Sequence, residues 1–315
     1  MKMFYLGPEG TFSQEPAQQF SSMLGYPDAE LVAKGTIIQV IEEVHQAVLD
    51  GQPDVFGCVP LENSIQGSVT MTWDMLGKVV SGTTATDPAS ASDSLAGPQI
   101  LASLTLPIEH YLLMLEGTRL EEVEEVISHP QALAQCQNSL SVLVPNARFT
   151  PVASTADAAR TVASEGKTTV VAVGTRQAGI RYGLEWRKQP VQDRNDNKTR
   201  FGLIGKQIPQ GRLAAKVQTQ TLSLLLSGVA NAPGGLYQTL QPFHDFQINL
   251  SRIESRPAGT RLGQYVFYID AEWPASDVNG QAGALDKVFE ALHAQQIGIF
   301  QLGLFPELQV TTQTV

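Results

Sequence analysis

Residues 54–69 read Asp-Val-Phe-Gly-Cys-Val-Pro-Leu-Glu-Asn-Ser-Ile-Gln-Gly-Ser-Val, and this stretch indicates both a strand and a site. The apolar run from Asp54 to Pro60 predicts a strand, and the polar side chains of Glu62, Asn63 and Ser64 follow it. In open α/β sheets, ligands bind beyond the carboxyl ends of the strands. A carboxylate, an amide and a hydroxyl there can orient a small polyfunctional molecule, although Asn and Ser also favour turns for local reasons.

Outward from this stretch, short apolar runs alternate with helical patterns. Further strands are predicted at 2–6, 123–128 and 169–173. Between 39 and 49 the apolar residues recur with helical spacing, which predicts a helix with one buried stripe. Other helices are predicted at 130–140, where a proline suits the first position, and from Ser154, which has the spacing of a capping box. This alternation predicts α/β architecture with mainly parallel sheets.

The pattern changes after Gly205. Residues 206–218 contain proline, glycine and basic side chains and are interpreted as a linker. Strands are then predicted at 220–226, 248–254, 265–271 and 297–305, with helices at 233–246 and 282–295. The order β-α-β-β-α-β is that of the ferredoxin-like split unit. We therefore expect one region at 1–205, a second domain at 219–305 and a tail at 306–315.

Composition argues against several classes of protein. The 315-residue chain is 43% apolar, which is enough for a substantial core, and its net charge is −10, whereas nucleic acids and membrane surfaces attract basic faces. No apolar stretch approaches the roughly 20 residues of a membrane span, and the N-terminus lacks the features of a signal peptide. We expect a cytoplasmic location, with Cys58 and Cys136 as buried free thiols.

Neither a metal nor another cofactor is expected. The histidines are scattered without the spacing of metal ligands, at positions His45, His110, His129, His244 and His293. Gly166-Lys167-Thr168 lacks the leading glycine of a phosphate-binding loop, and no Gly-x-Gly-x-x-Gly follows the first strand. The chain also has no Gly-x-Ser-x-Gly nucleophile elbow.

Two further polar segments begin at predicted helix starts. Thr11 and Ser13, in Leu-Gly-Pro-Glu-Gly-Thr-Phe-Ser at 6–13, lie where helix N–H groups either bind a carboxylate or phosphate or are simply capped. In Ser-His-Pro-Gln at 128–131, His129 is either a general base or a helix cap. Gln135 shares a helix face with the glutamine of this segment.

Two further segments are interpreted as loops. Asp-Arg-Asn-Asp-Asn-Lys-Thr-Arg-Phe at 193–201 gathers three cations in an acidic chain, so it is either a solvated loop or a loop that receives an anion. Residues 81–98 are rich in Ser, Thr, Ala, Gly and Asp. They are interpreted as a surface loop, either an active-site lid or a plain insertion.

Taken in order, these segments resemble the prephenate dehydratase family along nearly the whole chain. The catalytic signatures are Gly-Pro-x-Gly-Thr-Phe-Ser at 7–13, Glu-Asn-Ser at 62–64, Ser-His-Pro-Gln at 128–131 and Asn-x-Thr-Arg-Phe at 197–201. The regulatory signatures are Pro-Gly-Gly-Leu at 233–236 and Arg-Ile-Glu-Ser-Arg-Pro at 252–257, which are typical of the ACT domain, a small-molecule sensor. The family's usual sensing motif begins Gly-Ala-Leu, whereas this chain has Gly234-Gly235-Leu236.

The resemblance implies a fold and a reaction. The fold would have two α/β lobes like those of a periplasmic binding protein, with the substrate in the cleft, followed by a ferredoxin-like ACT domain. The reaction would convert prephenate to phenylpyruvate with release of CO₂ and water. ACT domains would pair in a dimer or tetramer and bind phenylalanine as a feedback inhibitor. Three alternatives stay open: arogenate as the substrate, a non-catalytic amino-acid-binding regulator, and an ACT domain that only oligomerises.

The resemblance also assigns the site residues. The catalytic residues would be Glu62, Asn63, Ser64, Ser128, Gln135 and Thr199. The substrate would also bind Arg200, Thr11 and Ser13. The phenylalanine site would use Asn231, Pro233, Gly234, Gly235, Leu236, Glu254, Ser255, Arg256 and Pro257.

Three of these residues carry specific hypotheses. Thr199 is expected to hydrogen-bond the departing hydroxyl and help to protonate it. Arg200 is expected to bind a substrate carboxylate by a two-pronged contact. Glu62 would repel an anionic substrate unless it is protonated, bonded to a neighbour or turned away.

Overall fold

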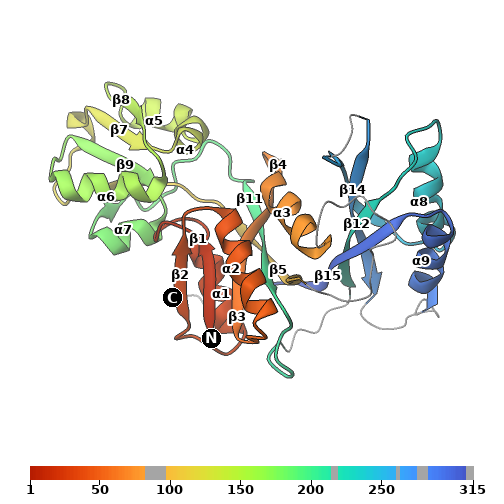
Figure 1. The fold of residues 1–315 in the computed structure, drawn as a ribbon. Coiled ribbons are helices and arrows are strands. Elements are labelled where there is room, and N and C mark those ends of the chain that lie inside the picture. The colour runs from red at the N-terminus through yellow and green to blue at the C-terminus, as the bar shows by residue number, and fades with distance from the viewer. Residues whose placement is uncertain (82–96, 214–218, 260–262, 275–282, 310–315) are drawn as a thin grey trace.

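The structure, a computed structural model, describes residues 1–81, 97–213, 219–259, 263–274 and 283–309. Figure 1 shows three parts in a row: a central first lobe that carries the N-terminus, a second lobe on its left and a C-terminal domain on its right. A continuous sheet runs from the first lobe into the C-terminal domain, in the order β13-β14-β12-β15-β5-β11-β3-β1-β2. No helix in the described part of the chain combines the length and the apolar character that crossing a membrane requires.

The first lobe occupies one end of this sheet. Its strands are β1 (Lys2–Leu6), β2 (Glu30–Lys34), β3 (Val55–Asn63), β4 (Gly67–Ser68), β5 (Gln99–Pro107) and β11 (Lys198–Gly205). Strand β1 pairs in parallel with β2 and β3, whereas β11 runs antiparallel between β3 and β5. Helix α1 (Gln14–Met23) packs in one apolar cluster, and α2 (Ile37–Leu49) and α3 (Thr70–Ser81) pack in the other. The sheet is therefore covered on both faces.

Helix α2 confirms the sequence pattern in detail. Thr36 caps it by accepting a hydrogen bond from the Gln39 N–H. The buried residues are those of the predicted stripe: Val40, Ile41, Val44, Ala47 and Val48. At a rough 1.5–3 kcal/mol for each large apolar side chain removed from water, this stripe supplies more stabilisation than helix propensity does.

The second lobe has its own sheet, in the order β10-β6-β9-β7-β8. Its strands are β6 (Tyr111–Met114), β7 (Glu125–Ser128), β8 (Arg148–Pro151), β9 (Val170–Gly174) and β10 (Glu185–Trp186). Its helices are α4 (Pro130–Gln135), α5 (Gln137–Leu143), α6 (Thr155–Glu165) and α7 (Arg176–Tyr182), besides a 3₁₀ turn at Leu120–Glu122. Strand β7 is parallel to β8 and β9, but β6 and β10 are antiparallel, so the sheets are more mixed than predicted.

The single helix predicted at 130–140 is wrong. Two helices occupy this stretch, and Cys136, which has non-helical backbone angles, separates α4 from α5. The distant Asp193 carboxylate accepts hydrogen bonds from the backbone N–H groups of Asn138 and Ser139. These contacts satisfy N–H groups at a second helix start, so the chain can break the first helix at little cost.

The C-terminal domain confirms the predicted β-α-β-β-α-β order. It consists of β12 (Thr219–Ser227), α8 (Gly235–Asp245), β13 (Leu250–Pro257), β14 (Tyr265–Pro274), α9 (Ala284–Ala294) and β15 (Gly298–Leu308). The tail expected from 306 begins later, because β15 continues to Leu308 and pairs in parallel with β5. Residues 206–213 of the predicted linker contain neither helix nor strand. Most of the predicted loop at 81–98 lies outside the described residues, as do 214–218 and 310–315.

The strand predicted to end at Pro60 also continues further. Strand β3 runs to Asn63, and β11 pairs with it across Glu62 and Asn63. The pairing register shifts beside Arg200, next to the pair of Phe201 with Pro60. A β-bulge of this kind accommodates a proline, which cannot donate to the ladder. Since successive strand residues point to opposite faces, the signature residues are divided between two sides of the sheet.

Candidate active site

A cavity of about 460 Å³ lies between the two lobes. Small-molecule sites typically measure roughly 300–1,000 Å³, so this volume suits one metabolite. The first lobe contributes the segment at 6–13 and the facing ends of β3 and β11, and the second contributes α4, the start of α6 and His110. Five of the predicted substrate-site residues line it: Thr11, Ser13, Asn63, Gln135 and Thr199.

Asn63 organises the polar wall of the cavity. Its Oδ1 accepts hydrogen bonds from the backbone N–H groups of Ile65, at 3.0 Å, and Gln66, at 3.1 Å. Its Nδ2 donates to Asn197 Oδ1, at 2.8 Å, and to Thr199 Oγ1, at 2.9 Å. Only an oxygen can accept from two N–H groups, so the backbone fixes which way this amide points. Thr199 therefore accepts from Asn63 and retains its own proton for donation.

Asn197 and Gln135 extend this chain into the second lobe. Asn197 Nδ2 donates to Gln135 Oε1 over 3.2 Å, and His110 Nε2 lies 2.9 Å from the same Gln135 oxygen. We call the five side chains Asn63, Thr199, Asn197, Gln135 and His110 the amide network. It joins both lobes across the cavity, so a change in lobe separation would disturb the hydroxyl of Thr199.

The cavity is largely neutral. Among the described residues that line it, none is Asp, Glu, Lys, Arg, Tyr or Cys, and the titratable side chains are His110 and His129. Burial lowers the pKa of His110, which the hydrogen bond to Gln135 partly opposes. His129 Nδ1 accepts from the Gln131 N–H and caps α4, as the cap interpretation predicted. Anion binding here must therefore come from helix N-termini and neutral donors.

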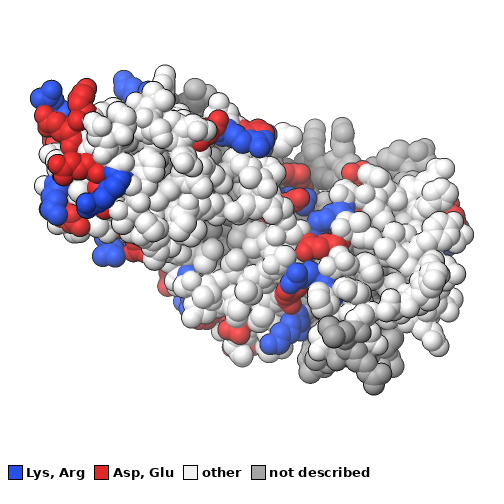
Figure 2. All heavy atoms as spheres, turned by 90° about the horizontal axis from the view of Figure 1, so that it is seen from above, with Lys and Arg blue, Asp and Glu red and all other residues white. Residues whose placement is uncertain are grey.

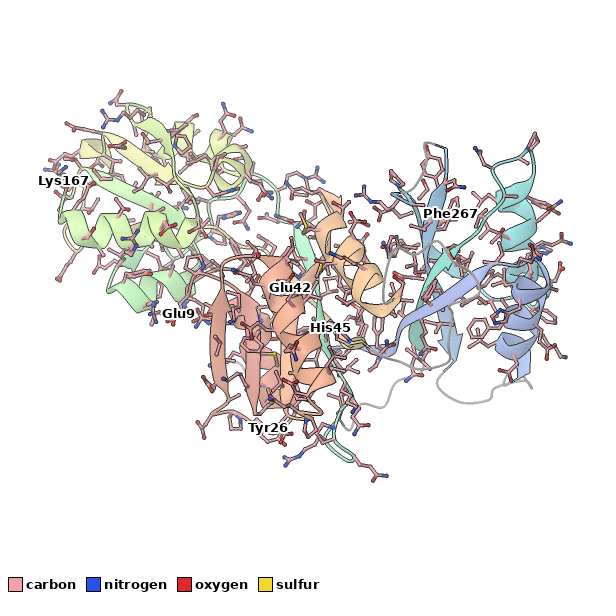
Figure 3. All side chains as sticks on the ribbon, viewed as in Figure 1. Glu9, Tyr26, Glu42, His45, Lys167 and Phe267 are labelled. Atoms are coloured by element: carbon pink, nitrogen blue, oxygen red, sulfur yellow. The ribbon has the colours of Figure 1, made fainter. Side chains whose placement is uncertain are left out.

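The first of these helix starts is held in place by other contacts. Thr11 donates its hydroxyl to the Leu6 carbonyl at 2.8 Å, and Ser13 makes no side-chain cap bond at the start of α1. Thr175 donates to the Gly10 carbonyl at 2.7 Å from the other lobe. Glu9, labelled in Figure 3, forms an ion pair with Arg181 in α7. The 6–13 segment is thereby fixed against the second lobe.

Four predicted residues do not line the cavity. Ser128 is fully buried and donates to the Val173 carbonyl at 2.6 Å. Ser64 donates to the Asp196 carbonyl and accepts from the Lys198 N–H, so it ties the chain before β11 to the end of β3. The other two are Glu62 and Arg200, which project from the opposite face of the paired strands. Direct contact of these four with a ligand in the cavity does not follow from this geometry.

Glu62 and Arg200 belong instead to an ionic cluster at the C-terminal domain. Arg200 Nη2 lies 2.6 Å from Glu62 Oε2 and 3.8 Å from Asp270 Oδ2. Asp270 is 1% exposed, accepts from Arg252 Nε at 3.0 Å and also bonds Ser223. The Arg252 guanidinium also lies 3.6 Å from the centroid of the Trp73 ring. Figure 2 shows basic and acidic atoms side by side where the C-terminal domain meets the first lobe.

A smaller pocket of about 170 Å³ lies in the C-terminal domain. Asn231 and Leu236, two of the predicted effector residues, line it together with Phe267, which Figure 3 labels on β14. Gly234 adopts a φ of +84° before α8, and a Cβ on Gly235 would lie 2.1 Å from the Ala230 carbonyl oxygen. The backbone before Leu236 therefore requires both glycines, which do not themselves line the pocket.

The remaining effector candidates lie elsewhere. Pro233 directly precedes the two glycines, whereas Glu254 to Pro257 lie in β13 and do not line this pocket. Glu254 Oε2 accepts a hydrogen bond from Arg252 Nη1 at 3.1 Å. Arg256 forms a two-pronged pair with Asp74 of α3, whose shorter contact is 2.6 Å. These charged groups of β13 contact the ionic cluster and the first lobe.

Sequence reasoning missed two members of the amide network. In the sequence, His110 is one of five scattered histidines and Asn197 lies in a polar segment, so neither is predicted to line the site. Each meets its partners across more than 20 residues of chain, so no local spacing reveals the contacts. A weak signal existed for Asn197, since it opens the Asn-x-Thr-Arg-Phe segment. In the described part of the chain, no three His, Cys, Asp or Glu side chains are grouped to hold a metal ion.

Comparison with known proteins identifies the family of this chain. The family model for prephenate dehydratase matches residues 3–209. Prephenate dehydratase of Methanocaldococcus jannaschii is 33% identical over 306 residues, which cover 96% of this chain and 97% of that protein. The chain therefore belongs to the prephenate dehydratase family, as its motifs predicted.

Solved structures share the fold. Prephenate dehydratase from Arthrobacter aurescens in complex with L-Phe has a TM-score of 0.76 and 26% identity, over 98% of this chain and 90% of that one. A protein described as GqqA, a novel type of quorum quenching acylase, has a TM-score of 0.74 and 23% identity, over 98% of both chains. The second likeness shows the fold alone. The two-lobed α/β fold class predicted from the sequence is confirmed.

Proposed function

We propose that this chain dehydrates and decarboxylates prephenate to phenylpyruvate in the cavity between the lobes. The observation that carries the proposal is the Thr199 hydroxyl, which accepts from Asn63 and so keeps its proton for a ligand. It lies in a cavity of metabolite size that has helix starts along its wall. Membership of the prephenate dehydratase family supports the same reaction.

The reaction needs a donor for the departing oxygen more than it needs a strong base. Prephenate carries two carboxylates and a ring hydroxyl. The ring carboxylate leaves as CO₂, its bonding electrons enter the ring, and the hydroxyl leaves at the far carbon as water after gaining a proton. Thr199 donates to that oxygen, with the proton replaced from solvent or a neighbour. Such positioned donation typically contributes about 10²–10⁴-fold.

Neutral donors and helix starts would hold the carboxylates. Thr11 and Ser13 sit at the start of α1, and Gln135 ends α4 with its amide on the cavity wall. These groups act in a site shielded by two lobes, where hydrogen bonds to charge are stronger than in water. We assign Ser64 and Ser128 to shaping the backbone around the site, and Glu62 and Arg200 to linking it with the C-terminal domain.

The cavity favours prephenate over arogenate. Arogenate carries an ammonium group where prephenate has a ketone, and a buried charge is stabilised best by a partner of opposite charge. No carboxylate is among the described residues that line this cavity. A non-catalytic regulator is also less favoured, because an amide network that frees one hydroxyl proton is more than a binding protein requires.

We further propose that the domain at 219–305 is an ACT domain that binds phenylalanine in the smaller pocket. The start of α8 at that pocket offers backbone N–H groups to a carboxylate. Apolar side chains of this domain are exposed, and they suit pairing with a second copy in a dimer or tetramer: Leu236, Tyr237, Ile253, Tyr265 and Leu304. Free buried thiols at Cys58 and Cys136 support a cytoplasmic location.

A prephenate turnover assay tests these proposals. Purified protein is mixed with prephenate and, in parallel, with arogenate, and product is followed with and without phenylalanine. We expect phenylpyruvate from prephenate and suppression by phenylalanine. Turnover of arogenate alone would refute the substrate assignment. Turnover of prephenate that phenylalanine leaves unchanged would refute the sensing role of the C-terminal domain.

A further inference from the structure

The amide network has a single direction of donation. Two backbone N–H groups require an oxygen on one side of the Asn63 amide, so its Nδ2 must donate to Asn197. Asn197 has then used its oxygen as an acceptor and must donate to Gln135 Oε1. A flipped Gln135 would set two NH₂ groups against each other. The orientation of each amide thus follows from the one before it.

The order of donors and acceptors in the amide network also determines which nitrogen of His110 carries a proton. The Gln135 oxygen has no proton to give, so the 2.9 Å contact with His110 Nε2 requires a proton on that ring nitrogen. His110 Nδ1 is buried and has no hydrogen-bond partner among the described residues. Among the described residues, its ring also contacts the Phe12 ring, at 5.1 Å between centroids, and its backbone bonds Val191 and Gln192. None of these neighbours titrates, so burial dominates and favours the neutral ring.

We infer that His110 is a positioning residue, which as the Nε2–H tautomer holds the Gln135 amide with its NH₂ group available to the ligand. Gln135 Oε1 is occupied by His110 and Asn197, so Nε2 is the end of this amide that can donate to an anionic substrate. Without His110, one of the two bonds that orient this amide is lost. The kinetic consequence rests on the proposed prephenate reaction, whereas the tautomer does not.

Two substitutions at His110 separate the roles of its nitrogens. The amide nitrogen of Gln reaches the Nε2 position of His, and that of Asn reaches the Nδ1 position. His110→Gln should preserve the bond to Gln135 and keep kcat within about fivefold of wild type, because one comparable hydrogen bond replaces another. His110→Asn should lower kcat by roughly 5- to 150-fold, the rate equivalent of one lost bond to a buried group. The exposed His293→Asn is the matched control.

The decisive experiment combines these kinetics with ¹⁵N NMR of the histidine rings, assigned by the loss of one signal in His110→Gln. We expect an Nε2–H tautomer for His110 that persists from pH 7 to pH 6, and a higher kcat for the Gln variant than for the Asn variant. An Nδ1–H tautomer, or an Asn variant as active as the Gln variant, would overturn the inference. If wild type fails to turn over prephenate, the proposed function fails and the tautomer still decides this inference. If neither His110 variant folds, the His110 signal is assigned by elimination, from the signal lost on substitution of each of the other four histidines.

Discussion

Strands β3 and β11 carry two cross-strand pairs in succession, Asn63 with Thr199 and Glu62 with Arg200, and the two pairs face different parts of the molecule. The first pair faces the cavity between the lobes, where none of the described lining residues is Asp, Glu, Lys or Arg. The second pair faces the C-terminal domain, where Arg252 and Asp270 complete the ionic cluster. Adjacent residues of one signature motif therefore meet opposite electrostatic environments.

One pair of strands can thus serve two parts of a protein. Strand alternation sends every second side chain to the other face, so the chemistry on one face need not resemble that on the other. The cavity face needs donors of fixed direction and little charge. The other face contains charges that stabilise one another and would be costly if separated. A motion of the C-terminal domain would reach Thr199 through its neighbour Arg200.

The largest expected effect is on the cavity face. Thr199→Ala removes the hydroxyl that donates to the departing oxygen, so kcat should fall by about 10²–10⁴-fold while the protein stays folded. Thr199→Ser keeps a hydroxyl and should recover much of this loss. Steady-state kinetics and thermal unfolding of both variants measure the effect. Near wild-type turnover in Thr199→Ala would break the assignment of chemistry to this face.

On the ionic face we expect loss of stability rather than of chemistry. Asp270→Ala leaves Arg252 and part of Arg200 without their buried partner, and breaking such a cluster costs about 3–5 kcal/mol. Below the unfolding transition, the turnover of prephenate should stay within about threefold of wild type, since Asp270 does not line the cavity. Unfolding by denaturant measures the free energy of unfolding of Asp270→Ala and of wild type. A stable Asp270→Ala protein with little turnover would mean that the ionic face supports catalysis and not stability.

The histidine of the amide network should make stability depend on pH. Burial lowers the pKa of His110 in the folded protein, so the unfolded chain takes up its proton more readily. Its contribution to stability is therefore complete above about pH 6.5, the ordinary histidine pKa, and is lost as pH falls toward the folded-state value. In His110→Gln, the free energy of unfolding should therefore depend less on pH in this range. Urea unfolding between pH 7.5 and 5.5 compares the two proteins, and identical slopes would contradict the effect.

The smallest effect is expected at a second contact between the same domains. Asp74 and Arg256 form a two-pronged pair, but their side chains are 43% and 32% exposed. Pairs screened by water contribute about 0–1 kcal/mol. Asp74→Asn should therefore lower the free energy of unfolding much less than Asp270→Ala does. Equal losses for the two variants would mean that burial does not distinguish these ion pairs.

Local patterns predicted those parts of the fold that depend on neighbours in sequence. The stripe of α2, the cap at Ser154 and the order of the C-terminal domain follow from side chains within a few residues of one another. The break at Cys136 could not be predicted, because the Asp193 carboxylate that supports it lies more than 50 residues away. The strand beyond Pro60 depends likewise on pairing with the distant strand β11, which skips Leu61 at a bulge in β3.

The residues of the candidate site were also predicted only in part. Asn63, Gln135 and Thr199 were predicted from motifs and line the cavity, as do Thr11 and Ser13. The family resemblance and the cations clustered at 193–201 place Arg200 at the substrate, yet in the structure it lies in β11 and points to the other face. Motifs identify which residues matter to a family. They do not say which face of a strand each residue occupies, because register depends on pairing partners.

The most direct test is the structure of Thr199→Ala with prephenate bound, since loss of the donor should slow turnover enough to retain the substrate. We predict prephenate between the lobes, with its ring hydroxyl at the place left by the Thr199 hydroxyl and a carboxylate at the amide of Gln135. Prephenate bound against Arg200 on the ionic face, with the cavity empty, would contradict the division between the two faces.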